Sequence, residues 1–219
     1  MFRNLRIAPE GYGIITFAFI ICVLFNILTI YFPLLFSGSL ANIMIFLFVG
    51  TCFFFRDPIR NIENQSSDLL SPADGKIVAI EKYQDPEIGE SIKIAIFLSI
   101  LNVHRQWVPL NAKVISTQYN PGAFSWAFMD KSSDKNEQTS ILFNDTASSN
   151  IFRVKQIAGF VARRIVNLMH PNSNVLKGQK LGFIKFGSRV EIIVPKNFEL
   201  RVKKGMKVKG CRTVIGKFN

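Results

Sequence analysis

Residues 181–194 read Leu-Gly-Phe-Ile-Lys-Phe-Gly-Ser-Arg-Val-Glu-Ile-Ile-Val, two apolar runs separated by Gly187-Ser188 and Arg189. Runs of this length, rich in aromatic and β-branched residues, are typical of β-strands. Glycine inside a strand often marks a bulge or the close approach of another backbone. The stretch therefore predicts two consecutive strands, 181–186 and 190–194, with a local break at the Gly-Ser pair.

The same pattern extends through most of the chain after residue 57, where short β-branched runs alternate with turn residues. Such spacing predicts a mainly β domain, an antiparallel sandwich or barrel. The other expected strands are 76–81, 92–98, 112–118, 139–143, 152–157 and 200–202.

Two segments of this domain favour short helices instead. Residues 159–169 have apolar residues at helical spacing, with Arg163 and Arg164 beside them, and a second short helix is expected at 123–129. Near the C-terminus, residues 175–182 resemble residues 202–210, because each segment has a Lys-Gly pair at an expected turn. Paired units of this kind occur in flattened sandwiches of the lipoyl-carrier type, so we expect lipoyl-like terminal turns.

The first 55 residues differ in composition and predict an N-terminal helical membrane anchor. Residues 13–32 carry no charge. Twenty helical residues at 1.5 Å each match a hydrocarbon core of about 30 Å. A second apolar run, 40–55, is short for a span. We expect residues 1–55 to form the anchor and residues 56–219 to form the second domain.

Charge placement favours a hairpin with both ends in the cytoplasm. Arginines flank the pair of apolar runs on its outer sides, and the connection 33–39 is uncharged. These arginines are Arg3, Arg6, Arg56 and Arg60. A single span or an interfacial wedge is the alternative, whereas a cleaved signal peptide is disfavoured because the first run is long.

The composition also restricts the partners and the compartment. The chain has 27 Lys and Arg against 15 Asp and Glu, a formal charge of +12. Such a surplus favours nucleic acid or a surface of anionic lipids, and the adjacent anchor decides for lipids. Cys22, Cys52 and Cys211 are scattered without metal-ligand or disulfide spacing, so we expect no metal site and a reducing compartment.

The Gly187-Ser188 pair permits a specific self-cleavage. Glycine has no side chain to block an approach of the Ser188 hydroxyl to the Gly187 carbonyl. Attack of Oγ there would replace the amide by an ester. β-Elimination of that ester leaves dehydroalanine, which hydrolyses to a pyruvoyl group and ammonia. A Gly-Ser pair alone, however, is most often an ordinary turn.

Two other residues are candidates for the same site. Asp74 lies in Ser-Pro-Ala-Asp-Gly, which is either a β-turn or a carboxylate held at the start of a strand, where it can orient a base. His104 follows an apolar strand, and its pKa range suits proton transfer near neutral pH. A purely structural histidine is the alternative. His170, in His-Pro-Asn-Ser, is interpreted as a surface residue.

Six segments of the chain are informative when they are taken together: 55–58, 71–75, 97–104, 136–137, 156–165 and 186–189. They occur in the order seen in phosphatidylserine decarboxylase proenzymes. The chain resembles the short, archaeal-like bacterial branch of that family, from about residue 53 to the C-terminus.

The resemblance implies an enzyme of phospholipid biosynthesis in the cell membrane, with its catalytic domain on the cytoplasmic face. The Gly187–Ser188 bond would be cut without hydrolysis, giving a heterodimer of a large subunit, 1–187, and a small subunit, 188–219. Ser188 would become a covalent pyruvoyl group that condenses with the amine of phosphatidylserine. Decarboxylation would then yield phosphatidylethanolamine, with no external cofactor.

The resemblance also suggests roles for the candidate residues. His104 would transfer the proton, and Asp74 would orient the imidazole of His104. Longer bacterial relatives carry a second histidine where this chain has Trp107, so the base for self-cleavage is left open. Arg163 and Arg164 are candidates for binding the lipid phosphate or the serine carboxylate, with a solvated helix face as the alternative.

Two other functions remain as alternatives. One is a non-catalytic, membrane-anchored β-sandwich adaptor or carrier, which the terminal Lys-Gly repeat would suit. The other is a pyruvoyl decarboxylase acting on a soluble amino acid, which the apolar leader disfavours.

Overall fold

The computed structural model describes residues 5–32, 38–62, 67–122, 136–148, 150–159, 164–185 and 188–218. The chain divides into two compact units, Met1–Ile59 and Arg60–Asn219. The change in sequence composition predicted the boundary between these units four residues earlier, between residues 55 and 56. Each unit is described here by itself.

The first unit contains the two apolar helices that the sequence predicts, α1 (Tyr12–Tyr31) and α2 (Gly38–Phe54). The rings of Phe19 and Phe48 pack with centroids 5.6 Å apart, which joins the two helices. A short 3₁₀ turn, η1 (Pro9–Gly11), precedes α1, and β1 (Leu5–Ile7) pairs antiparallel with β2 (Arg56–Pro58).

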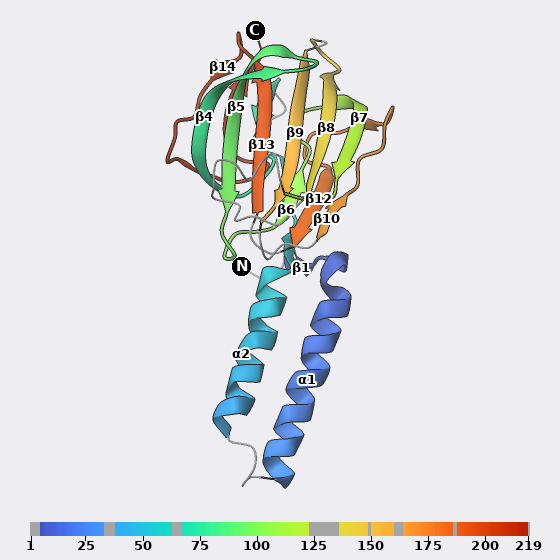
Figure 1. Cartoon of the computed structure of the whole chain (residues 1–219), viewed down its shortest axis with the longest axis vertical. Helices are drawn as coiled ribbons and strands as arrows, with labels where there is room; N and C mark the ends of the chain where they lie inside the picture. Colours follow the sequence, from blue (N-terminus) through green and yellow to red (C-terminus); the bar gives the residue numbers. More distant parts are fainter. Residues whose placement is uncertain are drawn as a thin grey trace. The chain divides into compact units, whose positions relative to one another are not determined.

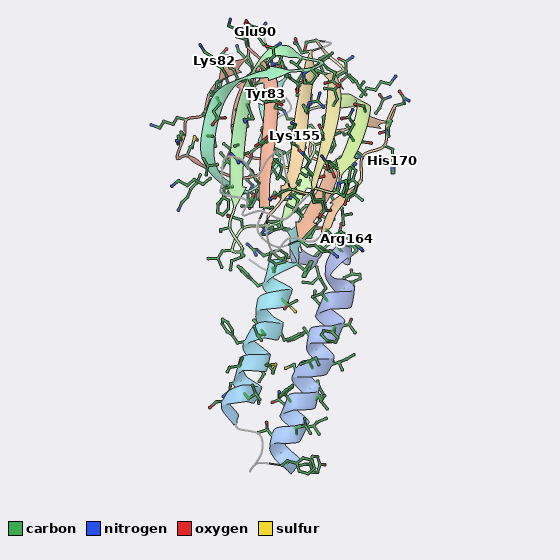
Figure 2. The ribbon with its side chains drawn as sticks, in the orientation of Figure 1. Lys82, Tyr83, Glu90, Lys155, Arg164 and His170 are labelled. Atoms are coloured by element: carbon green, nitrogen blue, oxygen red, sulfur yellow. The ribbon has the colours of Figure 1, made fainter. Side chains whose placement is uncertain are left out.

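Most side chains of α1 face outward (Figure 2), although they are apolar. Its polar side chains bond to the helix itself: Asn26 Nδ2 donates to the Cys22 carbonyl at 2.8 Å, and Thr29 Oγ1 donates to the Phe25 carbonyl at 2.8 Å. Such internal bonding is required of polar groups in hydrocarbon. By length and composition, Pro9–Tyr31 is able to cross a membrane, and Gly38–Phe54 is a shorter apolar helix.

The second unit is built on an antiparallel eight-stranded sheet that curls into a half-barrel (Figure 1). Its strand order is β11-β7-β8-β9-β13-β5-β4-β15. These strands are β4 (Gly75–Asp85), β5 (Gly89–Leu98), β7 (Ala112–Asn120), β8 (Gln138–Asp145), β9 (Ile151–Ala158), β11 (Asn174–Val175), β13 (Ser188–Pro195) and β15 (Lys207–Val208).

Two three-stranded sheets accompany the large one, with orders β10-β12-β6 and β14-β16-β3. Their strands are β3 (Asp68–Leu70), β6 (Arg105–Trp107), β10 (Arg164–Asn167), β12 (Lys180–Lys185), β14 (Glu199–Leu200) and β16 (Val214–Lys217). Ile192 of the large sheet, Ile184 of β12 and Ile215 of β16 belong to one buried cluster. The prediction of a mainly β fold with an N-terminal apolar helical segment is therefore confirmed.

Strand β13 lies in the middle of the large sheet, between β9 and β5 (Figure 1). Every residue from Ser188 to Val194 is buried, so both faces of this strand are covered. Val190 and Ile192 point into the main core, whereas Arg189 and Glu191 form a buried ion pair, with Nε and Oε1 3.3 Å apart.

The helix expected at 159–169 is wrong in its described part. Residues Arg164–Asn167 form strand β10, which pairs antiparallel with β12. Pairing with a neighbouring strand satisfies the backbone and buries Ile165 in the core, so tertiary contacts override a short helical pattern. The other short helix, expected at 123–129, lies outside the described residues.

The two Lys-Gly pairs near the C-terminus form the expected turns. Gly178 and Gly205 have φ angles of 80° and 90°, a region that favours glycine. At Gly178 a Cβ would also lie 2.3 Å from the Ile62 side chain, so any other residue there would be both strained and crowded.

Candidate active site

Ser188 is the first residue of the central strand. It pairs with Leu98, the last residue of β5, and with Ala158, the last residue of β9. Its neighbour Gly187 lies outside the described residues. Ser188 is fully buried, and its Oγ has no hydrogen-bond partner among the residues that the structure describes. A buried hydroxyl of this kind is uncommon and often marks a functional site.

His104 lies just beyond the end of β5, after a tight turn. Asn102 Oδ1 closes this turn by accepting hydrogen bonds from the Ser99 backbone N–H and from Ser99 Oγ, both at 2.9 Å. His104 is fully buried, with Nδ1 3.0 Å from the Asn102 carbonyl oxygen. Because a carbonyl only accepts, Nδ1 carries the hydrogen, and Nε2 of the neutral ring then holds a lone pair.

The backbone brings His104 and Ser188 to the same end of the sheet. Leu98, which pairs with Ser188, lies six residues before His104. The His104 carbonyl accepts the Ile184 N–H at 3.3 Å, and Ile184 lies near the end of β12, the strand before Ser188. The structure therefore places the two sequence-predicted residues in one neighbourhood, the base candidate beside the start of β13.

Two buried glutamines connect this neighbourhood. Gln106 Nε2 donates to the His104 carbonyl at 2.7 Å, and Gln156 Nε2 donates to Gln106 Oε1 at 2.9 Å. Both side chains are fully buried. Gln156 lies in β9 opposite Val190, and a Cβ on Gly182 would lie 2.6 Å from its amide nitrogen. The pair therefore fixes the His104 backbone relative to the strands around Ser188.

The sequence did not single out Gln106, and it marked Gln156 only as part of a motif. The available signal was weak, because Gln106 lay in no expected strand and Gln156 lay in an expected strand, 152–157, that also contains Arg153 and Lys155. Buried amides are stable only when hydrogen-bonded, so each glutamine predicts a buried polar partner without saying which one.

Asp74 is bonded by two residues that the sequence did not connect with it. Its carboxylate forms a two-point ion pair with Arg60, with Nη1–Oδ1 and Nη2–Oδ2 at 2.6 and 2.7 Å. Oδ1 also accepts the Gly210 N–H at 2.8 Å, and the Arg60 guanidinium lies 4.4 Å from the centre of the Trp107 ring. The expectation that Asp74 orients the His104 imidazole stays a prediction.

Trp107 is part of this arrangement, because its aromatic face attracts the guanidinium of Arg60. The positive charge of Arg60 offsets the negative charge of Asp74. We call the three residues Arg60, Asp74 and Gly210 the clamp.

The anion-binding candidates are only partly described. Arg164 is exposed at the start of β10, opposite Lys185 in β12, and Arg163 lies outside the described residues. Beside β10, the buried Glu137 accepts hydrogen bonds from the Tyr119 hydroxyl and the Ile165 N–H, both at 3.1 Å. Burial, and then the hydrogen bond to Glu137, raise the pKa of Tyr119.

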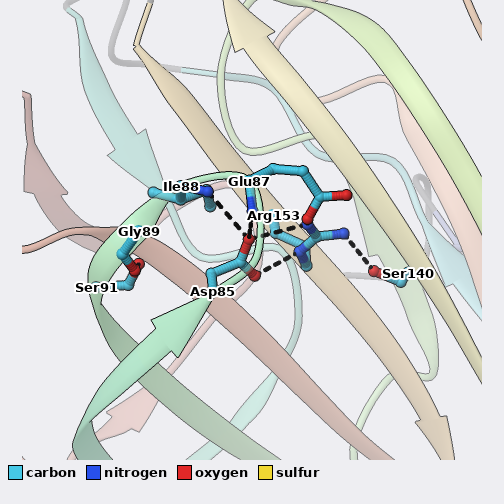
Figure 3. A network of polar contacts seen from close by, with 7 residues as sticks. All are labelled: Asp85, Glu87, Ile88, Gly89, Ser91, Ser140 and Arg153. Atoms are coloured by element: carbon cyan, nitrogen blue, oxygen red, sulfur yellow. Dashed lines mark hydrogen bonds and ion pairs between the residues drawn. The ribbon is translucent and has the colours of Figure 1, made fainter.

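A second polar cluster braces the other end of the sheet (Figure 3). Arg153 of β9 donates to both oxygens of Asp85, at 2.7 and 3.0 Å, and also contacts Glu87 and Ser140. Burial acts to raise the pKa of Asp85, but the bonds from Arg153 and from the Glu87 and Ile88 N–H groups outweigh it and lower that pKa. Because every polar side-chain atom of Asp85 and Arg153 has a hydrogen-bond partner, we infer that this pair stabilises the fold and takes no part in the chemistry.

The residues that the structure describes contain no group of three or more His, Cys, Asp or Glu side chains able to hold a metal ion. His170 is exposed (Figure 2), as its loop composition suggests.

The sequence profile of the family described as Phosphatidylserine decarboxylase matches residues 48–216. A phosphatidylserine decarboxylase proenzyme of Cupriavidus metallidurans is 39% identical over 210 residues, 95% of this chain and 94% of that protein. The chain belongs to the phosphatidylserine decarboxylase family. A proenzyme of the same name from Chlorobaculum parvum is 37% identical over 97% of this chain and 99% of its own length. Membership confirms the predicted enzyme class, a carboxy-lyase, and supports phosphatidylserine decarboxylation as the activity.

Proposed function

We propose that this member of the phosphatidylserine decarboxylase family cuts itself between Gly187 and Ser188 and makes a pyruvoyl group from Ser188. The observation that carries the proposal is the buried Ser188 hydroxyl at the start of the central strand, whose Oγ has no partner among the described residues. A serine with only a structural role there would destabilise the folded protein, because its buried hydroxyl forms no hydrogen bond. A nucleophile consumed during maturation explains its presence.

Self-cleavage requires a base for the Ser188 hydroxyl proton. His104 Nε2 supplies it, because the Asn102 carbonyl holds the hydrogen on Nδ1. As Oγ attacks the Gly187 carbonyl carbon, the Ser188 nitrogen accepts a proton and leaves. Loss of the Ser188 Cα proton then expels the Gly187 carboxylate and forms dehydroalanine. Addition of water to this residue releases ammonia and leaves the pyruvoyl carbonyl.

The surroundings of Ser188 fit such a group. Ser188 is fully buried at the same end of the sheet as His104, and its Oγ has no competing charged partner among the described residues. When formed, the pyruvoyl carbonyl supplies the electron sink that decarboxylation of an amino acid requires. His104 then serves as the proton carrier at the same position, and Gln106 and Gln156 hold its backbone.

The proposed cut gives a large subunit, 1–187, and a small subunit, 188–219. The small subunit would keep β13 between β5 and β9, β15 beside β4, and β16 beside β3. The clamp would join the subunits as well, because Gly210 belongs to the small one and Arg60 to the large one. We therefore expect a heterodimer that does not separate without unfolding.

The proposed substrate is phosphatidylserine in an anionic membrane. Helix α1 is the anchor, α2 completes a hairpin, and the arginines outside both helices put the second unit in the cytoplasm. Arg164, exposed at the same end of the sheet as Ser188, and Arg163 are proposed to attract the phosphate or carboxylate of the lipid.

Intact-mass measurement of the full chain, purified from membranes, tests this function. We expect two polypeptides, the smaller one starting at position 188 with a blocked N-terminus, and decarboxylation of phosphatidylserine but not of free serine. Ser188→Ala should give one uncut, inactive chain. Ser91→Ala, a buried serine whose Oγ bonds the Gly89 carbonyl at 2.7 Å, is the matched control and should process normally. An active protein with an intact 187–188 bond would refute the proposal.

A further inference from the structure

The turn between β5 and β6 exposes apolar side chains beside the candidate active site. Ile100 is 64% exposed and Leu101 is 68% exposed. Within the described part of the second unit, they are the only two consecutive large apolar residues that are exposed. Exposed apolar groups gathered at one place commonly mark a surface that contacts another body.

The turn is tied directly to the reacting groups. The turn follows Leu98, which pairs with Ser188 between strands β5 and β13. It ends at Asn102, whose carbonyl oxygen accepts a hydrogen bond from His104 Nδ1. The hydrogen bonds from Ser99 to Asn102 Oδ1 close it at both ends. Ile100 and Leu101 are therefore presented by a constrained turn whose position is coupled to that of the base.

The strands beside this turn add a third apolar side chain and two cations. Met206 is 38% exposed, and its carbonyl accepts the Ile77 N–H at 2.9 Å. Lys207 of β15 pairs with Lys76 of β4, and Lys76 pairs with Phe97 of β5. Both lysines are exposed. We call Ile100, Leu101, Met206, Lys76 and Lys207 the tip.

Three acidic side chains lie around the β4–β5 turn. Glu90, in β5, and Arg164 lie at opposite ends of the sheet (Figure 2), and Asp85 and Glu87 lie close to Glu90 in the sequence, at the end of β4 and in the turn. Asp74, near the start of β4, is neutralised by Arg60. An apolar tip flanked by lysines matches an anionic bilayer, where apolar groups enter the headgroup boundary and lysines stay among the phosphates.

We propose that the tip inserts into the surface of an anionic lipid bilayer and positions the buried site over a lipid headgroup. The inference rests on the proposed function for the identity of the substrate. An apolar anchor keeps a protein at the membrane, but it does not by itself hold a second domain with its active site facing the lipid. The tip supplies that orientation, since the turn that presents Ile100 and Leu101 leads directly to His104.

Two substrates separate docking from chemistry. The full, self-processed chain in phosphatidylglycerol-containing vesicles is assayed with long-chain phosphatidylserine, and in detergent with a short-chain, water-soluble phosphatidylserine. Replacing both Ile100 and Leu101 by serine should lower kcat/KM for the vesicle substrate roughly tenfold or more and leave the soluble substrate unchanged. Leu176→Ser is the matched control, because Leu176 is 70% exposed and precedes β12 at the opposite end. It should change neither rate.

A spectroscopic measurement tests the contact without activity. A tryptophan at position 101 (Leu101→Trp) should be quenched by brominated lipids in phosphatidylglycerol vesicles, relative to the parent chain, and less in phosphatidylcholine vesicles. Absence of quenching, equal vesicle rates for the double variant, or loss on both substrates would overturn the inference. A detergent-stable dimer that the double variant abolishes would assign the tip to self-association instead. Failure of the proposed function gives a different result. The unsubstituted chain would then be uncut and inactive, whereas the quenching of Trp at position 101 would still measure contact of the tip with lipid.

Discussion

Replacing Arg60 by alanine removes the cation that the clamp places on Asp74. The two side chains are only 9% and 13% exposed, and two hydrogen bonds of 2.6 and 2.7 Å join them. The substitution leaves a mostly buried carboxylate with only the Gly210 N–H, and it uncovers the Trp107 ring. Removing one member of a buried ion pair costs about 3–5 kcal/mol. For a protein of this size that corresponds to a drop in Tm of roughly 6–20 °C.

The assay is thermal unfolding of the full chain in detergent, with processing followed by intact mass. Arg60→Lys retains the charge but not the two-point geometry, so its loss should be intermediate. The double variant with Asp74→Ala should cost less than the sum of the single variants, by about 1–3 kcal/mol. The control is Lys196→Ala, which breaks an exposed pair with Glu90 and should leave Tm unchanged.

The same variants decide between two roles for Asp74. If it acts through the clamp, Arg60→Ala and Asp74→Asn slow processing to a similar extent and in proportion to the stability lost. A fully stable Asp74→Asn chain that no longer cuts itself, beside an Arg60→Ala chain that does, would refute the reasoning. Asp74 would then act on the reacting groups directly.

Further predictions concern the base candidate His104, the glutamine Gln156, the ion pair of Asp85 with Arg153, and the buried thiol of Cys211. His104→Ala should abolish processing, turnover or both in mass and activity assays, and normal rates in both would remove it from the site. Gln156→Leu should destabilise the chain by about 1–3 kcal/mol, because Gln106 loses its donor, and slow processing at constant pH; an unchanged rate would separate the glutamines from His104. Because the pKa of Asp85 lies below its ordinary 3.8, its stabilisation is complete above that value and is lost as pH falls through the folded-state pKa. Asp85→Asn should therefore lower Tm at neutral pH by a margin that shrinks below about pH 4, and a constant margin would contradict this. Burial raises the pKa of Cys211 to about 12, so an alkylating reagent at pH 8 should label it only after unfolding, as peptide mapping would show.

Local patterns were sufficient to predict most of the architecture. The strands at 181–186 and 190–194 follow from β-branched runs, and the apolar helices follow from the absence of charge over 13–32. These features depend on residues close together in the chain. The strand at 164–167 does not, because its partner β12 is chosen by the tertiary fold, and the helical spacing of the segment carried no information about that partner.

The candidate site divides in the same way. Ser188 and His104 were accessible from the sequence because each lies in a segment that resembles the phosphatidylserine decarboxylase family. The partner of Asp74 was not, since Arg60 served in the sequence only as a flanking charge, and its placement depends on Trp107 and on Gly210, which is 136 residues from Asp74. Long-range pairings between polar side chains have no local signature, so the clamp could be found only from the structure.

The position of β13 has a consequence for the life of the enzyme. If the chain is cut before Ser188 as proposed, the middle of the sheet becomes a separate peptide, and the covalent connection that guided this strand between its neighbours exists only before the cut. A mature molecule that unfolds must recapture its own central strand from solution, against the entropy of bringing two chains together. Its durability would then be governed by how slowly it opens rather than by how readily it reforms.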